Sequence, residues 1–164
     1  MKRLFAFLIS VFLLTSTACA NGSRGINSSD KGEVTDMKIS IQITSDSGNH
    51  NLTATLADNS SAVAFYELLK EDPLTVKLNE YGGFEKVGSL GTSLPRNDRQ
   101  VKTSAGDIML YQGNQITIFY NGNSWSYTPL GKVVSTSSTT TITQAELKKI
   151  LGKGDVTAVF SVME

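Results

Sequence analysis

Apolar and polar residues alternate along much of the chain from Met37 onward, which is the pattern of β-strands. Over residues 37–44 every second residue is Met or Ile, and the residues between them are polar. Because successive side chains of a strand point to opposite faces, this pattern predicts a strand with one buried face. Further strands are predicted over residues 52–56, 74–78, 84–87, 108–111, 115–120, 125–128, 130–134 and 156–162. The pattern therefore predicts a mostly β domain.

Turns and irregular stretches separate these strands. Residues 45–51 are rich in turn-forming residues, so they are predicted to form a turn that carries His50. Residues 88–100 are the longest stretch within the domain core that is predicted to be irregular. Pro129 has no N–H to donate to a strand ladder, so it is predicted to separate the two weak strands on either side of it. Residues 135–141 are all Ser or Thr and are predicted to be a solvated loop.

Two stretches show the helical period instead. The first has its cap at residues 59–60 and ends before Pro73, because the residue before a proline is pushed away from helical geometry. The second begins at Thr143, which forms a capping box with Glu146, and ends at Gly152. Many strands and two short helices predict a closed β-barrel of about eight strands with the helices over its openings.

The first twenty residues have the order charged, apolar, small that is typical of a secretory signal peptide. Lys2 and Arg3 precede an apolar run over residues 4–14. That run is roughly half of the ~20 apolar residues that a membrane-spanning helix needs, so a permanent transmembrane helix is the poorer interpretation. The chain is therefore predicted to be exported.

Two processing sites overlap at the end of this segment. The sequence Thr17-Ala18-Cys19 resembles a bacterial lipobox, in which the cysteine becomes the acylated new N-terminus. Ala18 and Ala20 also suit ordinary cleavage before Asn21, which would release a periplasmic or secreted protein. Lipidation is favoured because Cys19 is the single cysteine and lies where lipidation would use it. It predicts a lipoprotein of the cell envelope that meets the membrane through its lipid anchor only.

Residues 21–36 have no periodic apolar pattern and are predicted to be a flexible linker, which leaves residues 37–164 as one domain. The chain has 15 Lys and Arg against 15 Asp and Glu, and removal of the signal peptide takes away Lys2 and Arg3. The mature protein is therefore mildly acidic, and no nucleic-acid partner is predicted.

Composition also excludes several kinds of chemistry. One cysteine cannot form an internal disulfide or a cysteine-based zinc cluster. His50 is the single histidine, so a histidine-rich metal site or a Ser-His-Asp triad would have to be built on this one turn residue. No catalytic residue, metal or cofactor is predicted.

Several short motifs, taken in order, resemble the bacterial cyclophilin-like domain family, and the similarity covers residues 37–164. The motifs are MKISI (37–41), LTATLADNS (52–60), AGDIMLY (105–111), ITIFY (116–120), YTPLGK (127–132) and LGKGDV (151–156). The resemblance implies an eight-stranded barrel with two helices. It does not imply isomerase activity, because the Phe-His-Arg stretch of true cyclophilin isomerases is absent. Arg96 and Arg99 are the two arginines of the domain, and neither has that context.

Aromatic residues gather in the middle of the domain and are the candidate ligand-binding residues, together with the two arginines. They are Phe84, Tyr111, Phe119, Tyr120, Trp125 and Tyr127, with Arg96 and Arg99. Phe119 and Tyr120 are consecutive in a strand, so they must point to opposite faces. An aromatic groove with an arginine beside it could hold an apolar or proline-containing peptide segment. Alternatively, these aromatic side chains simply fill the core and the barrel exterior.

Three functions remain open at this point. The first is a non-catalytic module of the cell envelope that binds a small molecule or a peptide. The second is a divergent peptidyl-prolyl isomerase that uses Arg96 or Arg99. The third is a purely structural envelope component with a stable protein partner.

Overall fold

The computed structural model describes residues 36–134 and 142–163, which all belong to one unit that spans residues 35–164. The predicted signal peptide, the predicted linker up to residue 35 and the predicted loop at residues 135–141 lie outside the described residues. None of the helices in the described part of the chain is long and apolar enough to span a membrane.

Nine strands and two helices make up the described unit. In chain order they are β1 (Lys38–Ser45), β2 (Gly48–Leu56), α1 (Ser60–Glu71), β3 (Leu74–Tyr81), β4 (Glu85–Ser89), β5 (Arg99–Lys102), β6 (Asp107–Tyr111), β7 (Gln115–Phe119), β8 (Ser124–Val134), α2 (Gln144–Leu151) and β9 (Val156–Val162).

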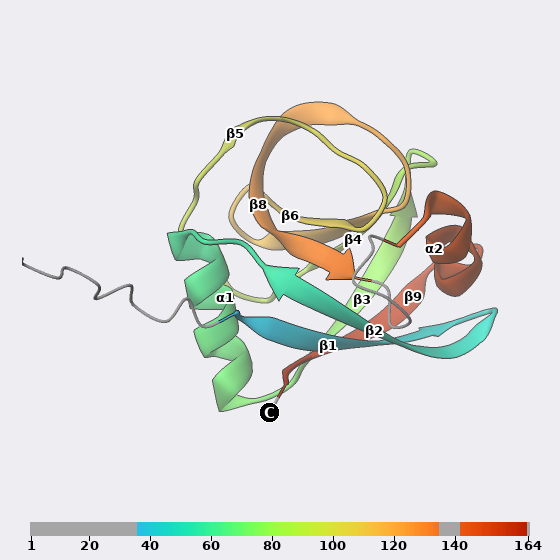
Figure 1. Ribbon diagram of the computed structural model, residues 1–164, viewed down its shortest axis with the longest axis horizontal. Coiled ribbons are helices and arrows are strands. Elements are labelled where there is room, and N and C mark those ends of the chain that lie inside the picture. The colour runs from blue at the N-terminus through green and yellow to red at the C-terminus, as the bar shows by residue number, and fades with distance from the viewer. Residues whose placement is uncertain (1–35, 135–141, 164) are drawn as a thin grey trace, which may run out of the picture. The chain divides into compact units, whose positions relative to one another are not determined.

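Eight of the strands hydrogen bond in a closed ring (Figure 1). Their order is β2-β1-β9-β3-β4-β7-β6-β8, every pairing is antiparallel, and β8 closes the ring by pairing with β2 from Thr53↔Val134 to Leu56↔Gly131. The ninth strand, β5, pairs with β8 only. The predicted mostly β fold with two helices is confirmed.

The main core fills the inside of the ring, because strand alternation turns one set of side chains inward. In β1 these are Ile39, Ile41 and Ile43, which are all nearly fully buried. Helix α1 lies against β8 and β9, and its Phe65 ring makes a T-shaped contact with the ring of Phe160, with 5.8 Å between ring centroids. Helix α2 lies against β1, and the two helices are on opposite sides of the ring of strands (Figure 1).

A second, smaller apolar cluster is separate from the main core. Its buried members are Met109, Phe119 and Tyr127, from β6, β7 and β8. In β7, Ile116 and Ile118 point into the main core, whereas Phe119 points to the opposite face and belongs to the second cluster. Strand β7 is therefore buried on both faces. Apolar packing therefore continues on the outer face of the ring.

The predicted helix ends are confirmed in detail. Asn59 is the N-cap of α1, and its side chain accepts hydrogen bonds from the backbone of Ser61 and Ala62. Thr143 and Glu146 form the reciprocal capping box of α2. Gly152 ends α2 with a positive φ of 59°, which a residue without a Cβ adopts readily.

The prediction that Pro129 separates two strands is wrong, because β8 runs through it. The register between β6 and β8 shifts at this point, so that Ile108 faces Gly131 while Met109 faces Pro129. A strand can contain a proline at such an irregularity, although the proline has no N–H to donate to the ladder of hydrogen bonds. The Pro129 carbonyl accepts a hydrogen bond of 2.8 Å from the side chain of Asn59.

Two of the predicted non-strand stretches are also too long. Only residues 46–47 lie between β1 and β2, so His50 belongs to β2, where it pairs with Ile43. Its Nε2 atom is 2.9 Å from the Ser47 hydroxyl. The ends of the predicted irregular stretch 88–100 belong to β4 and β5. In the first case the hairpin pairing of β2 with β1 continues into residues that form turns readily, and in the second case pairing with the distant strands β7 and β8 extends the β structure.

Closure of the ring leaves no space for a side chain at Gly131. A Cβ added there would lie 2.6 Å from the Thr55 carbonyl oxygen and 3.1 Å from the Cα of Leu56. We expect Gly131→Ala to lower the free energy of unfolding by about 2 kcal/mol in denaturant titration. The control is Gly122→Ala, whose Cβ would meet only the Thr103 carbonyl, at 3.4 Å. Equal stability of the two variants would contradict this account of the closure.

Candidate functional site

A pocket of about 400 Å³ opens on the outer face of the ring, beside the second apolar cluster. We call it the aromatic pocket. It is lined by Tyr81, Phe84, Glu85, Val87, Tyr111, Gln115, Asn123, Trp125 and Tyr127.

Strand register explains why these side chains meet. Residues that face each other on neighbouring strands project to the same side of a sheet. Glu85 of β4 faces both Tyr81 of β3 and Phe119 of β7, so all three belong to the outer face. Phe84 follows two glycines with positive φ, and a Cβ on Gly82 would lie 2.2 Å from its ring. The turn between β3 and β4 thus holds Phe84 against the pocket.

The aromatic rings pack on one another in an unbroken series. Phe84 stacks on Phe119 with an interplanar angle of 8° and 6.2 Å between centroids. Phe119 meets Tyr127 at 5.3 Å and 72°, and Tyr127 meets Tyr111 at 5.8 Å and 60°. Tyr81 meets the ring of Phe84 edge-on at 5.8 Å. These offset and edge-to-face contacts are the favourable geometries for aromatic pairs, so the pocket walls are held in place before any ligand arrives.

Two aromatic side chains of the aromatic pocket remain open to solvent. Tyr81 is 60% exposed and Trp125 is 58% exposed, although both are large and apolar. Tyr127 is buried, and its hydroxyl accepts a hydrogen bond of 2.9 Å from the side chain of Asn123. Large aromatic side chains that stay exposed together at a pocket are a common mark of a binding surface.

Glu85 is the one charged residue among the lining residues. It is only 6% exposed, and its Oε2 atom is buried without a hydrogen-bond partner. Burial raises the pKa of the Glu85 carboxyl to about 7, because the charged form loses its hydration and gains nothing in exchange.

The next residue, Lys86, is also buried but has partners. It faces Ile118 of the main core, so it projects to the inner face, opposite to Glu85. Its ammonium group forms an ion pair of 2.6 Å with Glu80 and donates hydrogen bonds to the carbonyls of Gly152 and Gly154. The fold therefore supplies partners for one buried charge of β4 and none for the other.

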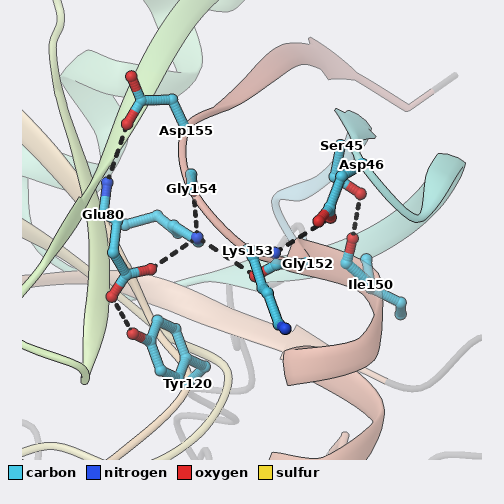
Figure 2. Close-up of polar contacts among 10 residues, drawn as sticks. Ser45, Asp46, Glu80, Tyr120, Ile150, Gly152, Lys153, Gly154 and Asp155 are labelled. Carbon is cyan, nitrogen blue, oxygen red and sulfur yellow. Dashed lines mark hydrogen bonds and ion pairs between the residues drawn. The ribbon is translucent and has the colours of Figure 1, made fainter.

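Figure 2 shows the surroundings of this ion pair. The Tyr120 hydroxyl donates to the Glu80 carboxylate, and the backbone N–H of Glu80 donates to Asp155. Burial raises the Glu80 pKa, but the hydrogen bonds and charge of Lys86 and the bond from Tyr120 outweigh it and leave the pKa lowered. The network stabilises this end of the ring.

A larger hollow of about 730 Å³ lies beside this network. It is lined by Asp46, Ser47, Glu80, Gly83, Tyr120, Lys148, Lys149, Leu151, Gly152, Lys153 and Gly154. Several of its polar groups already bind each other: Lys153 N–H donates to Asp46 at 3.0 Å (Figure 2), and the Lys148 ammonium lies 5.7 Å from the Tyr120 ring centroid. The aromatic pocket is therefore the better candidate for a site, although it is the smaller hollow.

A family model described as the Cyclophilin-like family matches residues 45–161 of this chain. The chain belongs to this cyclophilin-like family. The family resemblance inferred from the sequence motifs is thereby confirmed.

Among solved structures, the chain is similar to the hypothetical protein AF2241 from Archaeoglobus fulgidus, known from a solution structure. The two share 14% sequence identity with a TM-score of 0.54, and the match covers 81% of this chain and 99% of that chain. A likeness at this identity shows the fold alone. No curated protein matches the chain.

Most of the aromatic residues predicted as ligand-binding come together in the cyclophilin-like domain. Phe84, Tyr111, Trp125 and Tyr127 line the aromatic pocket, and Phe119 packs beneath them. Tyr120 projects to the inner side instead, where it lines the larger hollow.

Neither predicted arginine lines the aromatic pocket. The Arg96 guanidinium forms an ion pair with Asp98, and a Cβ added to Gly113 would lie 3.2 Å from the Arg96 side chain. Arg99 lines a third hollow, of about 410 Å³, together with residues such as Asp107 and Lys132. Among residues 36–134 and 142–163, no three His, Cys, Asp or Glu side chains form a group that could hold a metal ion.

Five lining residues were not predicted from the sequence: Val87 within β4, and Tyr81, Glu85, Gln115 and Asn123. Each of the last four lies in or beside a turn, where polar and exposed residues are expected. One sequence feature could have indicated that Glu85 is buried. Glu85 and Lys86 are consecutive in a short strand, so they point to opposite faces, and the flanking apolar residues Phe84 and Val87 also lie on opposite faces.

Titration of Glu85 makes the stability of the cyclophilin-like domain depend on pH. The folded state keeps this proton up to a pH of about 7, against 4.5 for an unperturbed glutamate, so it binds more protons than the unfolded chain in that range. Stability therefore falls as the pH rises through this window. We expect Glu85→Gln, which mimics the protonated carboxyl, to raise the free energy of unfolding by about 3 kcal/mol at pH 8 and by less than about 1 kcal/mol at pH 5.

Denaturant titrations at the two pH values check this expectation. The control is Glu71→Gln, which changes an exposed carboxyl at the end of α1. A gain from Glu85→Gln that does not change with pH would show that the carboxyl is not held neutral by burial.

Proposed function

We propose that this protein is an exported, lipid-anchored binding module of the cell envelope, which holds an apolar small molecule or peptide segment in the aromatic pocket. One observation carries the proposal. Five aromatic side chains from three strands and one turn surround a single pocket, and two of them stay more than half exposed. They are Tyr81, Phe84, Tyr111, Trp125 and Tyr127.

The shape of the aromatic pocket supports a small ligand. Its volume of about 400 Å³ is within the range of small-molecule sites, and its lining is mostly apolar with a few polar groups. Because the rings already pack on one another, a ligand would order few side chains when it binds. Less affinity is then lost to conformational entropy.

The other two functions have weaker support. A divergent isomerase was inferred from Arg96 or Arg99, and neither arginine lines the aromatic pocket. A purely structural component would leave the exposed Tyr81 and Trp125 without a role. We therefore propose binding rather than catalysis.

The location rests on the sequence of the first twenty residues. Cys19 follows Thr17-Ala18 in a lipobox-like position, after a charged and an apolar segment. A lipid on Cys19 would hold the domain at the membrane through the linker at residues 21–36, which leaves the aromatic pocket free to meet ligands in the envelope.

Intact-mass measurement of full-length protein extracted from bacterial membranes tests the anchor. We expect a mature chain that begins at Cys19 and carries the added mass of acyl chains. Cys19→Ala should move the protein into the soluble fraction. A mature wild-type chain that begins at unmodified Asn21 would contradict lipid anchoring.

Fluorescence of Trp125 tests binding, because it is the single tryptophan of the chain and lines the aromatic pocket. The probes are capped, uncharged dipeptides that carry one Leu, Phe or Pro side chain. We expect at least one to change the fluorescence saturably, and Tyr81→Ala to weaken its binding about tenfold. Val63→Ala removes a comparably exposed apolar side chain from α1 and should leave binding unchanged. The absence of any saturable change, with these dipeptides and with small aromatic probes, would contradict the proposal.

A further inference from the structure

The unpartnered Glu85 carboxyl calls for an explanation, because buried polar atoms in folded proteins almost always have a hydrogen-bond partner. The Oε2 atom of Glu85 has no such partner, and the residue is only 6% exposed. Its side chain lines the aromatic pocket. A charge in such a place is tolerated where a ligand completes the site.

The other lining residues do not supply a cation. They contain no Lys, Arg or His. The side-chain amide of Asn123 donates to Tyr127 rather than to Glu85. Lys86 follows directly in the chain, but it projects to the inner face and binds Glu80 there. The cation that would pair with Glu85 must therefore come from outside the described residues.

The titratable groups around Glu85 are the tyrosines of the neighbouring strands. Tyr81, Tyr111 and Tyr127 line the same pocket, and Tyr120 follows β7. Burial raises the pKa of Tyr127, and the negative charge of Glu85 raises it further. Burial, Glu80 and, to a smaller degree, Glu85 raise the pKa of Tyr120. The hydroxyls of Tyr120 and Tyr127 therefore stay neutral at physiological pH, whereas the pKa of the Glu85 carboxyl lies near that pH.

The aromatic walls favour a cation as well. The face of an aromatic ring is the negative end of its quadrupole and attracts ammonium groups within about 6 Å. Five rings and one carboxyl make the aromatic pocket attractive to positive charge and unfavourable for anions. Apolar surface beside the charge site would accommodate the carbon chain of the ligand.

We propose that the aromatic pocket binds a protonated amine, whose N–H group donates to Glu85 while the aromatic rings enclose the attached apolar body. This proposal rests on the proposed binding function and names its ligand class. The amine can belong to a free alkylammonium compound or to a lysine side chain of a peptide. The chemistry at Glu85 is the same for both.

A pH dependence of binding follows from this arrangement. The carboxyl must be ionised to pair with the ammonium group, and burial raises the pKa of free Glu85 to about 7. Below that pH, binding has to displace the proton. Affinity for the amine therefore falls as the pH decreases below about 7, while affinity for an uncharged ligand does not.

Titration calorimetry with a matched pair of probes tests the proposal on the full domain. The probes are 2-phenylethylamine and 2-phenylethanol, which share the aromatic body and differ in charge. At pH 8 we expect the amine to bind at least tenfold more tightly than the alcohol, and this ratio to shrink severalfold at pH 5.5. Glu85→Gln should bring the ratio close to one at both pH values without weakening the alcohol, whereas Glu71→Gln should change nothing.

Further ligands separate the remaining outcomes. A trimethylammonium analogue has no N–H, so binding as tight as that of the amine would overturn the role of Glu85 as hydrogen-bond acceptor. A capped lysine dipeptide that binds more tightly than 2-phenylethylamine would indicate that the amine belongs to a peptide. Tighter binding of 2-phenylethylamine would indicate a small-molecule ligand. Equal affinity of wild type for amine and alcohol would overturn this proposal and leave the proposed function standing. Failure of both probes and of all apolar dipeptides would overturn both. The comparison of ligands on wild type does not depend on any variant folding.

Discussion

Strand alternation within a closed ring is the constraint on which the rest of this structure depends. In β4 it sends two consecutive charged residues to opposite faces, Lys86 inward and Glu85 outward. Lys86 stands opposite Ile118 of the main core, and Glu85 stands opposite Phe119 of the outer cluster. A shift of the β4 register by one residue would turn Glu85 toward the main core and Lys86 toward the outer cluster, away from its partner Glu80. The register of β4 thus determines both the ion pair with Glu80 and the composition of the aromatic pocket.

The closed ring also explains why the candidate site is on the outside. Apolar side chains fill the middle of the ring, and the larger hollow on the inner side is lined by polar groups that already bind each other. The outer face of β4, β6, β7 and β8 is different, because β8 continues beyond the ring to pair with β5 and brings Trp125 and Tyr127 with it. Phe119 packs between this part of the chain and Phe84. The aromatic pocket is therefore built on a rigid sheet, although several of its residues come from turns.

Features set by local interactions could be predicted from the sequence, and features set by distant neighbours could not. The capping residues Asn59 and Thr143 satisfy amides within three residues of themselves, so their role is visible in the sequence. Pro129 was predicted to end a strand because nothing local shows the shifted register that tolerates it. Arg96 pairs with Asp98 only two residues away, but whether its side chain reaches the aromatic pocket is set by the fold and not by its place in the sequence. Glu85 was missed because its distant neighbour Phe119 becomes visible only with the strand register.

The buried, unpartnered carboxyl of Glu85 is the central claim of this account, and NMR titration of its carboxyl carbon tests it most directly. The account predicts a titration midpoint near pH 7 in the free domain, because burial raises this pKa to about 7. It also predicts that saturating 2-phenylethylamine lowers the midpoint, since the ammonium group favours the ionised form. A midpoint near the ordinary glutamate value of 4.5, unchanged by the amine, would contradict it.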